Sequence, residues 1–176
     1  MRADAARNVE AVLRAAARVF AADPQARIPD VAAAAGVDRR TVYRRFDSRE
    51  ELLLAVYRAR LDQLETLITS TLDDRPVREA LLAFCEGGVR LSREWPVDIR
   101  AVADAEVQRR RVELDARMSA FLERAEEAGL ISAGSPAGWA LRTLQTQLHT
   151  AAQEMPSLSA ADAATLVVST FLHGVS

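Results

Sequence analysis

The 176-residue sequence contains no lysine and a single cysteine, Cys85. One cysteine excludes an intramolecular disulfide, which is typical of a protein kept in a reducing compartment. Seven glycines and six prolines are too few for a disordered or low-complexity chain. No apolar run approaches the ~20 residues needed to span a bilayer, and residues 1–4 lack the apolar core of a signal peptide. We therefore expect a cytoplasmic protein with no membrane partner.

Motifs typical of catalysis or cofactor binding are also missing. The only histidines, His149 and His173, fall on different predicted helices without the spacing of metal ligands. The sequence has no phosphate-binding glycine loop and no GxSxG nucleophile motif. Cys85 has no histidine near it in the sequence, which favours a small buried hydrophobe over a nucleophile. We therefore predict that the protein is not an enzyme and binds no cofactor or metal.

Charge is distributed unevenly along the chain. Residues 1–50 carry a net charge of +3 and residues 51–176 a net charge of −5. A basic end on an acidic body favours local contact with a polyanion, although so small an excess also arises by chance. The triplet Arg109-Arg110-Arg111 lies among Glu106, Glu113 and Asp115, which indicates a solvated helix face rather than a second nucleic-acid site.

Apolar residues recur at helical spacing along almost the whole chain, and no stretch alternates for long enough to indicate a strand. The sequence therefore predicts an all-α fold of eight or nine helices. We expect them at about residues 5–22, 31–36, 39–45, 48–72, 77–93, 97–128 (in one or two pieces), 136–154 and 159–174. The expected end signals are a capping box from Ser48 to Glu51, a C-cap at Gly129, and N-caps at Ser135-Pro136 and Ser159.

The most informative segment is IPDVAAAAGVDRRTVYRRFDSREELL, residues 28–53. Two short predicted helices meet at Gly36-Val37-Asp38. Glycine permits the left-handed backbone that the turn of a helix-turn-helix requires. Asp38 is a good N-cap for the helix that follows. This spacing predicts a helix-turn-helix.

The second of these helices has an inner and an outer side. At ~100° per residue, Val42 and Phe46 fall in one narrow sector and should face the core. Arg40 and Arg44 lie on the opposite side. Because arginine can hydrogen-bond O6 and N7 of guanine, the outer side suits the major groove of DNA.

The neighbouring side chains support the same interpretation. Thr41 can touch a thymine methyl group, and Tyr43 can hold a phosphate. Arg49 begins the next predicted helix, where helix N-termini attract phosphate. We predict a DNA-binding surface made of Arg27, Asp38, Arg39, Arg40, Thr41, Tyr43, Arg44, Arg45 and Arg49.

The segment resembles the N-terminal domain of the TetR (tetracycline-repressor) family of bacterial regulators, over about residues 9–57. The matching residues are Ala17, Phe20, Val31-Ala32, Ala35-Gly36-Val37, Thr41-Val42-Tyr43, Phe46, Arg49-Glu50 and Leu52-Leu53. Two segments depart from the pattern. Arg27-Ile28-Pro29 stands where the family often has a capping Ser or Thr, and Asp23-Pro24-Gln25 replaces the usual glycine between the first two helices.

The resemblance implies a three-helix helix-turn-helix domain at residues 1–48 and an effector-binding and dimerisation domain at residues 49–176. It implies a homodimer on a palindromic double-stranded operator, with recognition helices about 34–36 Å apart. The last two helices, at about 136–154 and 159–174, would form a four-helix bundle with their symmetry mates. The residues we expect to serve both the core and the dimer interface are Leu141, Leu144, Leu148, Leu166, Val167, Phe171 and Leu172.

The resemblance also implies a small-molecule effector that binds among the helices of about residues 60–150. Binding would favour a state whose recognition helices are wrongly spaced for the operator. Apolar residues dominate this region, so we expect an apolar or aromatic effector. The candidate lining residues, each of which could equally be plain core, are Phe84, Cys85, Trp95, Met118, Phe121, Leu122, Trp139 and Gln147. The polar neighbours of Gln147, which could hold a ligand or pair across the dimer seam, are Thr143, Thr146, His149 and Thr150.

Other functions stay open on the sequence. A helical ligand-binding protein or enzyme with an accidental helix-turn-helix would show no salt-sensitive binding to any duplex. A regulator that acts through a protein partner would have no effector pocket. An activator would share all these features with a repressor.

Overall fold

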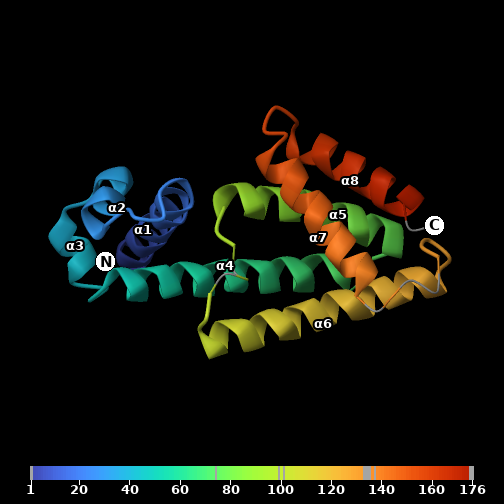
Figure 1. The fold of residues 1–176 in the computed structure, drawn as a ribbon, viewed down its shortest axis with the longest axis horizontal. Helices are drawn as coiled ribbons and strands as arrows, with labels where there is room; N and C mark the ends of the chain where they lie inside the picture. Colours follow the sequence, from blue (N-terminus) through green and yellow to red (C-terminus); the bar gives the residue numbers. More distant parts are fainter. Residues whose placement is uncertain are drawn as a thin grey trace. The chain divides into compact units, whose positions relative to one another are not determined.

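The computed structural model describes residues 2–73, 75–98, 100, 102–132, 136 and 138–174. Within these residues the protein consists of eight helices and no strands (Figure 1). They are α1 (Arg2–Ala22), α2 (Ile28–Ala35), α3 (Arg39–Tyr43), α4 (Arg49–Leu72), α5 (Val77–Glu94), α6 (Ala105–Glu127), α7 (Trp139–Gln153) and α8 (Ala160–Gly174). The predicted all-α fold is confirmed. No helix in the described part combines the length and apolar character that crossing a bilayer requires.

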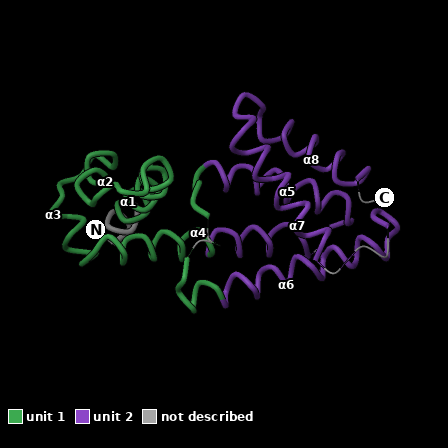
Figure 2. Tube along the Cα trace, in the orientation of Figure 1, with its two compact units in different colours: residues 1–61, 94–108 green, residues 62–93, 109–176 purple. Residues whose placement is uncertain are grey.

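The chain divides into two compact units (Figure 2). Unit 1 comprises Met1–Leu61 and Glu94–Gln108, and unit 2 comprises Asp62–Arg93 and Arg109–Ser176. Both α4 and α6 therefore contribute residues to each unit. The expected domains meet at residue 48, whereas the division between the units falls inside α4, where an unbroken helix gives the sequence no boundary signal.

Unit 1 is built on close packing of α1 against α2 and of α2 against α3. On α1, Ala15, Ala16 and Ala17 are almost completely buried, and their small side chains let neighbouring helices approach closely. Val31 of α2 and Val42 of α3 are also buried. A compact scaffold thus holds the helix-turn-helix.

Unit 2 has a core of larger side chains and a close pairing of α7 with α8. Leu81, Leu144 and Phe171 are fully buried, and each such side chain contributes about 1.5–3 kcal/mol to folding. On α5, an added Cβ atom at Gly87 would meet Leu67 Cδ1 of α4 at 2.2 Å. Glycine at that position therefore allows the close approach of α5 to the Leu67 side chain.

Several predicted helix ends are confirmed. Gly129 has φ +70 and ends α6, with the N–H of Leu130 donating to the carbonyl of Ala125 at 2.9 Å. Ser159 Oγ accepts from the N–H of Asp162 at 3.1 Å and caps α8. Ser135 lies outside the described residues, and α7 begins later than predicted, after Gly138.

The predicted start of the helix at residue 97 is wrong. Residues 102–104 are not helical, and α6 begins at Ala105. Asp104 Oδ1 accepts a hydrogen bond from the N–H of Val107 at 3.0 Å, which is the geometry of an N-cap. The prediction followed the apolar spacing, which begins before residue 105, and did not use Asp104 as an N-cap.

The seven apolar residues of α7 and α8 that were expected to serve both the core and the dimer interface differ in burial. Leu141, Leu144, Leu148, Val167, Phe171 and Leu172 are buried within this single chain, whereas the side chain of Leu166 is 43% exposed. The six buried residues are used by the core of unit 2 itself, because α7 and α8 turn their apolar sides inward. Among these seven residues, Leu166 is the one whose side chain stays exposed in the single chain.

Candidate nucleic-acid interface

The turn between α2 and α3 is set by Gly36. Its φ of +67 is left-handed, and an added Cβ atom would meet nothing within 4 Å. The N–H of Val37 donates to the carbonyl of Ala32 at 3.0 Å, which closes the end of α2. The glycine is therefore needed for its backbone conformation rather than for space, as predicted.

Asp38 starts α3, as the sequence predicts. Its Oδ1 atom accepts from the N–H of Arg40 at 2.7 Å. The helix is assigned to Arg39–Tyr43, two residues shorter than predicted. Helical hydrogen bonds nevertheless continue, because the N–H of Phe46 donates to the carbonyl of Val42 at 2.9 Å. The side chains through Phe46 thus keep helical spacing.

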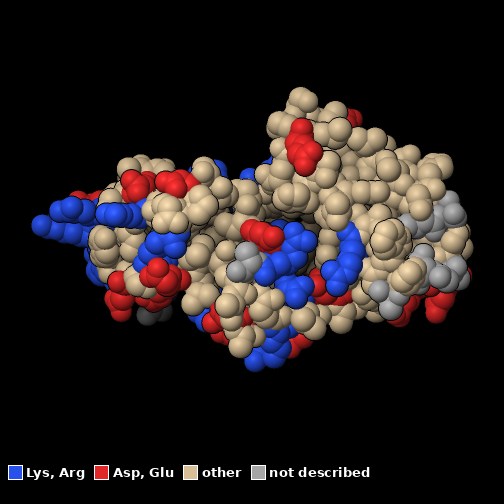
Figure 3. Space-filling model, in the orientation of Figure 1, with Lys and Arg blue, Asp and Glu red and all other residues tan. Residues whose placement is uncertain are grey.

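The two sides of this segment differ in exposure as predicted. Val42 is 1% exposed and Phe46 is 6% exposed, whereas Tyr43 is 46% exposed. Thr41 is partly buried. The four exposed arginines of the segment are Arg39, Arg40, Arg44 and Arg45. In the space-filling view, basic side chains project from the α2–α3 end of unit 1 (Figure 3).

These four arginines differ from the other arginine cluster of the chain, on α6, in their partners. Within the described residues, none of them forms an ion pair with a carboxylate. The arginines of the Arg109-Arg110-Arg111 triplet on α6, by contrast, pair with carboxylates. Arg110 lies 2.7 Å from Asp62 and 3.0 Å from Glu65, and Arg111 lies 2.9 Å from Asp115. Guanidinium groups without a carboxylate partner attract phosphate and other acceptors, so the α3 segment is better suited than the α6 triplet to a polyanion.

The first turn of α2 is capped by a residue that the sequence analysis missed. Asp30 Oδ2 accepts from the N–H of Arg27 at 2.8 Å, and no side chain of residue 27 caps the helix. The carboxylate three residues into the helix replaces the Ser or Thr that the family pattern has. The Arg27 side chain is exposed. An acid at the third helical position was the signal that could have shown this.

Arg49 has a structural role that the sequence analysis also missed. Its Nε atom donates to the carbonyl of Ala26 at 2.9 Å, and one terminal nitrogen donates to the carbonyl of Pro24. The guanidinium also lies 4.8 Å from the centroid of the Phe20 ring. Arg49 thus joins α4 to the end of α1 and to the following loop, which leaves less of its hydrogen-bonding capacity for a phosphate.

The capping box before α4 is present in modified form. Ser48 Oγ accepts from the N–H of Glu51 at 3.0 Å, as predicted. The Glu51 carboxylate reaches one residue further back than expected, because its Oε2 atom accepts from the N–H of Asp47 at 2.6 Å. Side chains of Ser48 and Glu51 therefore both stabilise the link between α3 and α4.

The candidate effector residues of unit 2 are mostly buried. Phe84, Cys85, Met118, Phe121 and Leu122 are each at most 5% exposed. Burial raises the pKa of the Cys85 thiol to about 12, so this cysteine is neutral and not a nucleophile.

Two further candidates on α7 differ from this group. Trp139 is 54% exposed in this single chain, unlike the buried candidates. Its place at the first position of α7 explains this, since the core of unit 2 is filled from Leu141 onward. In the described residues, Gln147 Oε1 is buried without a hydrogen-bond partner.

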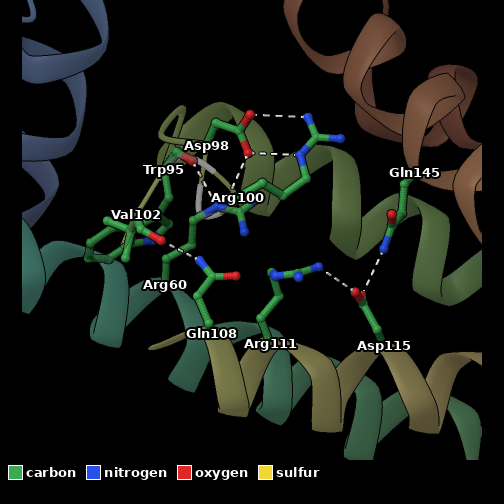
Figure 4. Close-up of polar contacts among 9 residues, drawn as sticks. All are labelled: Arg60, Trp95, Asp98, Arg100, Val102, Gln108, Arg111, Asp115 and Gln145. Atoms are coloured by element: carbon green, nitrogen blue, oxygen red, sulfur yellow. Dashed lines mark hydrogen bonds and ion pairs between the residues drawn. The ribbon is translucent and has the colours of Figure 1, made fainter. Parts of the chain in front are cut away.

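Trp95 belongs to unit 1, in a polar cluster that the sequence analysis did not find (Figure 4). We call this the Arg60 cluster; it comprises Arg60, Trp95, Asp98, Arg100 and Gln108. Arg60 Nε donates to the carbonyl of Trp95 at 3.1 Å. Burial lowers the pKa of Arg60, partly offset by the nearby Asp98 carboxylate.

Asp98 is held by Arg100. Asp98 Oδ1 accepts from the backbone N–H of Arg100 at 3.0 Å and from its Nε at 2.9 Å, and Oδ2 accepts from a terminal nitrogen at 3.2 Å. Burial by itself would raise the pKa of Asp98, but the hydrogen bonds from Arg100 outweigh it and lower the pKa. Asp98 is therefore ionised at neutral pH.

Figure 4 also shows a second polar chain, which lies within unit 2. Asp115 accepts from Arg111 at 2.9 Å and from Gln145 Nε2 at 2.9 Å, so it connects α6 with α7. Among the described residues, no three His, Cys, Asp or Glu side chains are grouped in a way that could hold a metal ion.

Comparison with known proteins gives one family. Residues 12–56 match the model of the family described as bacterial regulatory proteins, tetR family. This range contains α2, α3 and the residues of the predicted DNA-binding surface. No curated protein matches the sequence.

Solved structures match the chain over nearly its whole length. The TetR-like regulator LfrR from Mycobacterium smegmatis, in complex with proflavine, has 26% identity and a TM-score of 0.79, with 97% of each chain covered. A TetR-family regulator from Marinobacter aquaeolei has 22% identity and a TM-score of 0.75, covering 99% of this chain and 98% of its own. PfmR from Thermus thermophilus has 21% identity and a TM-score of 0.74, covering 94% and 95%. The last two show the fold alone.

Proposed function

We propose that the chain, whose residues 12–56 match the tetR family of bacterial regulatory proteins, represses transcription as a homodimer bound to a palindromic operator and is released by a small, largely apolar effector. Operator binding would place the protein in the cytoplasm. The observation that carries the proposal is the α3 segment, in which Val42 and Phe46 are buried while Arg40, Tyr43 and Arg44 are exposed.

This arrangement suits the major groove. Arg40 and Arg44 are unpaired in the described residues and can each offer two donors to guanine. Tyr43 and the exposed Arg39 and Arg45 are suited to phosphates. The Asp38 cap and the Gly36 turn fix the segment before DNA arrives, so little ordering would accompany binding.

We test operator binding by selecting genomic fragments with the full-length protein and measuring affinity for the recovered duplex at several salt concentrations. We expect a palindromic site and an affinity that falls steeply with salt. The double variant Arg40→Ala/Arg44→Ala should abolish selection. The double variant Arg90→Ala/Arg109→Ala removes the same charge from exposed positions elsewhere and should leave it unchanged.

The outcomes separate the alternatives. A helical enzyme or binding protein without operator function would select no fragment and show no salt-dependent affinity. Equal loss in both double variants would mean that charge alone, rather than the α3 segment, drives binding. Either result would contradict the proposal.

Effector release is supported by the apolar core of unit 2 and by the unpartnered Gln147 Oε1, which could accept a hydrogen bond from a ligand. The crystal structure of LfrR holds proflavine, so proflavine is a suitable first probe. Effector and operator should weaken each other's binding by the same factor. A ligand that binds without changing operator affinity, with operator likewise leaving ligand affinity unchanged, would remove this part of the proposal.

A further inference from the structure

Both α4 and α6 continue from unit 1 into unit 2. The division between the units falls between Leu61 and Asp62 on α4, and between Gln108 and Arg109 on α6 (Figure 2). An α-helix carries a shift along its length because its own backbone hydrogen bonds hold it together. A change in the register of α4 against α6 in one unit is therefore carried into the other.

Side-chain contacts join α4 to α6 at a constant spacing. The contacts are Arg58 to Glu106 at 2.8 Å, Arg110 to Asp62 at 2.7 Å and Arg117 to Thr69 at 2.9 Å. Each of them links residues that are 48 positions apart in the sequence. The two helices therefore run in the same direction and keep one register from residue 58 to residue 69, which is ~16 Å along the helix.

The two ion pairs on either side of the division between the units have opposite polarity. In unit 1, α4 supplies the arginine, Arg58, and α6 supplies the acid, Glu106. In unit 2, α4 supplies the acid, Asp62, and α6 supplies the arginine, Arg110, which also lies 3.0 Å from Glu65. We call Arg58–Glu106 and Asp62–Arg110 the crossed ion pairs.

This polarity opposes a slip of α4 along α6. A slip by one turn, about four residues, changes the separation of facing residues from 48 to 52 or to 44. A separation of 52 would bring Arg58 to Arg110, and a separation of 44 would bring Asp62 to Glu106. Like charges that face each other on helix surfaces are destabilising. The observed register is therefore the one that the charges favour.

The balance of charges holds when Glu65 is included. A slip would bring Glu65 to Arg117 or to Arg109, depending on its direction. Each slip thus gains one pair of opposite charges, but it loses both crossed ion pairs and adds a repulsion.

We propose that the crossed ion pairs select a single register of α4 against α6, and that this register sets the spacing between operator half-sites that the dimer recognises. Exposed ion pairs contribute little to folding, so their main effect is to discriminate between registers. Arg58, Asp62, Glu106 and Arg110 are thus positioning residues for operator binding. The effect on DNA rests on the proposed function, whereas the selection of the register does not.

The register can be measured without DNA by cysteine cross-linking in a Cys85→Ala background, which contains no other thiol. Arg117→Cys is combined with Glu65→Cys, Thr69→Cys or Asp73→Cys, which report separations of 52, 48 and 44. Because neighbouring turns lie ~5.4 Å apart, the pair with Thr69→Cys should cross-link at least about tenfold faster than the other two. Equal rates for the three pairs would contradict a single register.

A double variant tests whether charge selects this register. Arg58→Glu/Asp62→Arg reverses the polarity on α4 without changing the net charge, and it places like charges together in the observed register. The preference for the pair with Thr69→Cys should fall at least about threefold. An unchanged preference in a variant that circular dichroism shows to be folded would overturn the proposal.

Two further variants serve as controls. Adding Glu106→Arg/Arg110→Glu to the first double variant restores opposite charges and should recover most of the preference. The recovery should be incomplete, because Glu65 then faces an introduced acid. Arg109→Glu/Glu113→Arg reverses an exposed pair within α6 and should leave the preference unchanged. Loss of the preference in this last variant would mean that the crossed ion pairs have no special role.

The effect on DNA is measured with the selected duplex and with the same duplex carrying one extra base pair at its centre, which moves the half-sites apart by ~3.4 Å and turns them by ~34°. The wild type should prefer the selected duplex at least about tenfold, and the α4 double variant should reduce this preference at least about threefold. An unchanged preference would overturn the role in operator binding. Selection of no duplex by a protein whose register follows the charges would refute the regulator proposal and leave the register intact.

Discussion

The guanidinium of Arg49 lies over the ring of Phe20, 4.8 Å from its centroid, and couples the first turn of α4 to the end of α1. The carbonyls of Pro24 and Ala26 accept two of its N–H groups. The Arg49 side chain thus connects α4 both to α1 and to the α1–α2 loop.

We expect Arg49→Ala to lower the free energy of unfolding by about 1–3 kcal/mol, because it removes a cation–π contact and two hydrogen bonds to backbone carbonyls, one of them partly buried. Urea denaturation followed by circular dichroism measures the change. Arg58→Ala removes an exposed, singly paired arginine of the same helix and should cost under about 0.5 kcal/mol. Equal effects of the two substitutions would contradict the role given to Arg49.

Arg44 and Tyr43 should affect DNA binding in different ways. Arg44→Ala should weaken operator binding by about 1–3 kcal/mol and relax the preference at one base pair, since a bidentate contact to guanine is lost. Tyr43→Phe should weaken binding to all duplexes by a similar factor, since phosphate contacts carry no sequence information. Fluorescence anisotropy on the operator and on singly substituted duplexes separates the two. If the loss of DNA affinity in both variants is explained by a lowered melting temperature, both assignments are refuted.

Gly87 and Gly88 should respond differently to alanine. At Gly87 the new Cβ would meet Leu67 Cδ1 at 2.2 Å, whereas at Gly88 the nearest atom is Leu148 Cδ1 at 3.5 Å, an ordinary contact. Gly88→Ala should therefore gain about 0.5–1 kcal/mol from helix propensity. Gly87→Ala should gain less, because the flexible, partly exposed Leu67 side chain must shift to admit the new Cβ. Adding Leu67→Ala should restore the gain at Gly87. A double-mutant cycle with no coupling between residues 67 and 87 would contradict the close approach of α5 to Leu67.

Cys85 should make stability fall at alkaline pH. Burial raises the pKa of its thiol to about 12, whereas the unfolded thiol titrates near ~8.5. The unfolded state therefore loses its proton first, so the stabilisation is fully present below ~8.5 and declines by up to ~1.4 kcal/mol per pH unit toward 12. The difference between wild type and Cys85→Ala isolates this term. The folded protein should also resist thiol reagents at neutral pH, and rapid labelling would show that the thiol is accessible.

Leu166 should matter for association. It is 43% exposed on α8, and the other apolar residues predicted for the dimer face are buried in the chain's own core. Leu166→Arg should therefore raise the dimer dissociation constant at least about tenfold by placing a charge in an apolar interface. Leu82→Arg, at a 40% exposed position on α5, is the matched control. Sedimentation equilibrium that shows no difference between the two would contradict a dimer through α8.

The fold and the exposed arginine-rich side of the α3 segment could be predicted because each depends on local signals. Apolar spacing reports helices, Gly36 reports a left-handed turn, and Val42 with Phe46 reports the buried side of α3. Arg49 shows the limit of this reasoning. A phosphate contact and a contact to the carbonyl of Ala26, 23 residues away in sequence, need the same residue type, and only the tertiary structure reveals the second.

The Arg60 cluster could not be predicted for the same reason. Arg60 and Trp95 are 35 residues apart, and neither belongs to a motif. The exposure of Trp139 was missed because helical spacing indicates which residues share a side, but not where the core ends. Helix ends were least certain where a side chain such as Asp104 overrides an apolar pattern that runs past it.

Since α3 is anchored by Val42 and Phe46, its outward positions are not constrained by packing. Arg40, Tyr43 and Arg44 could be exchanged for other polar residues at little cost in folding, and the backbone would present the new side chains in the same register. A few surface substitutions on α3 could thus change the target sequence without any change in unit 2.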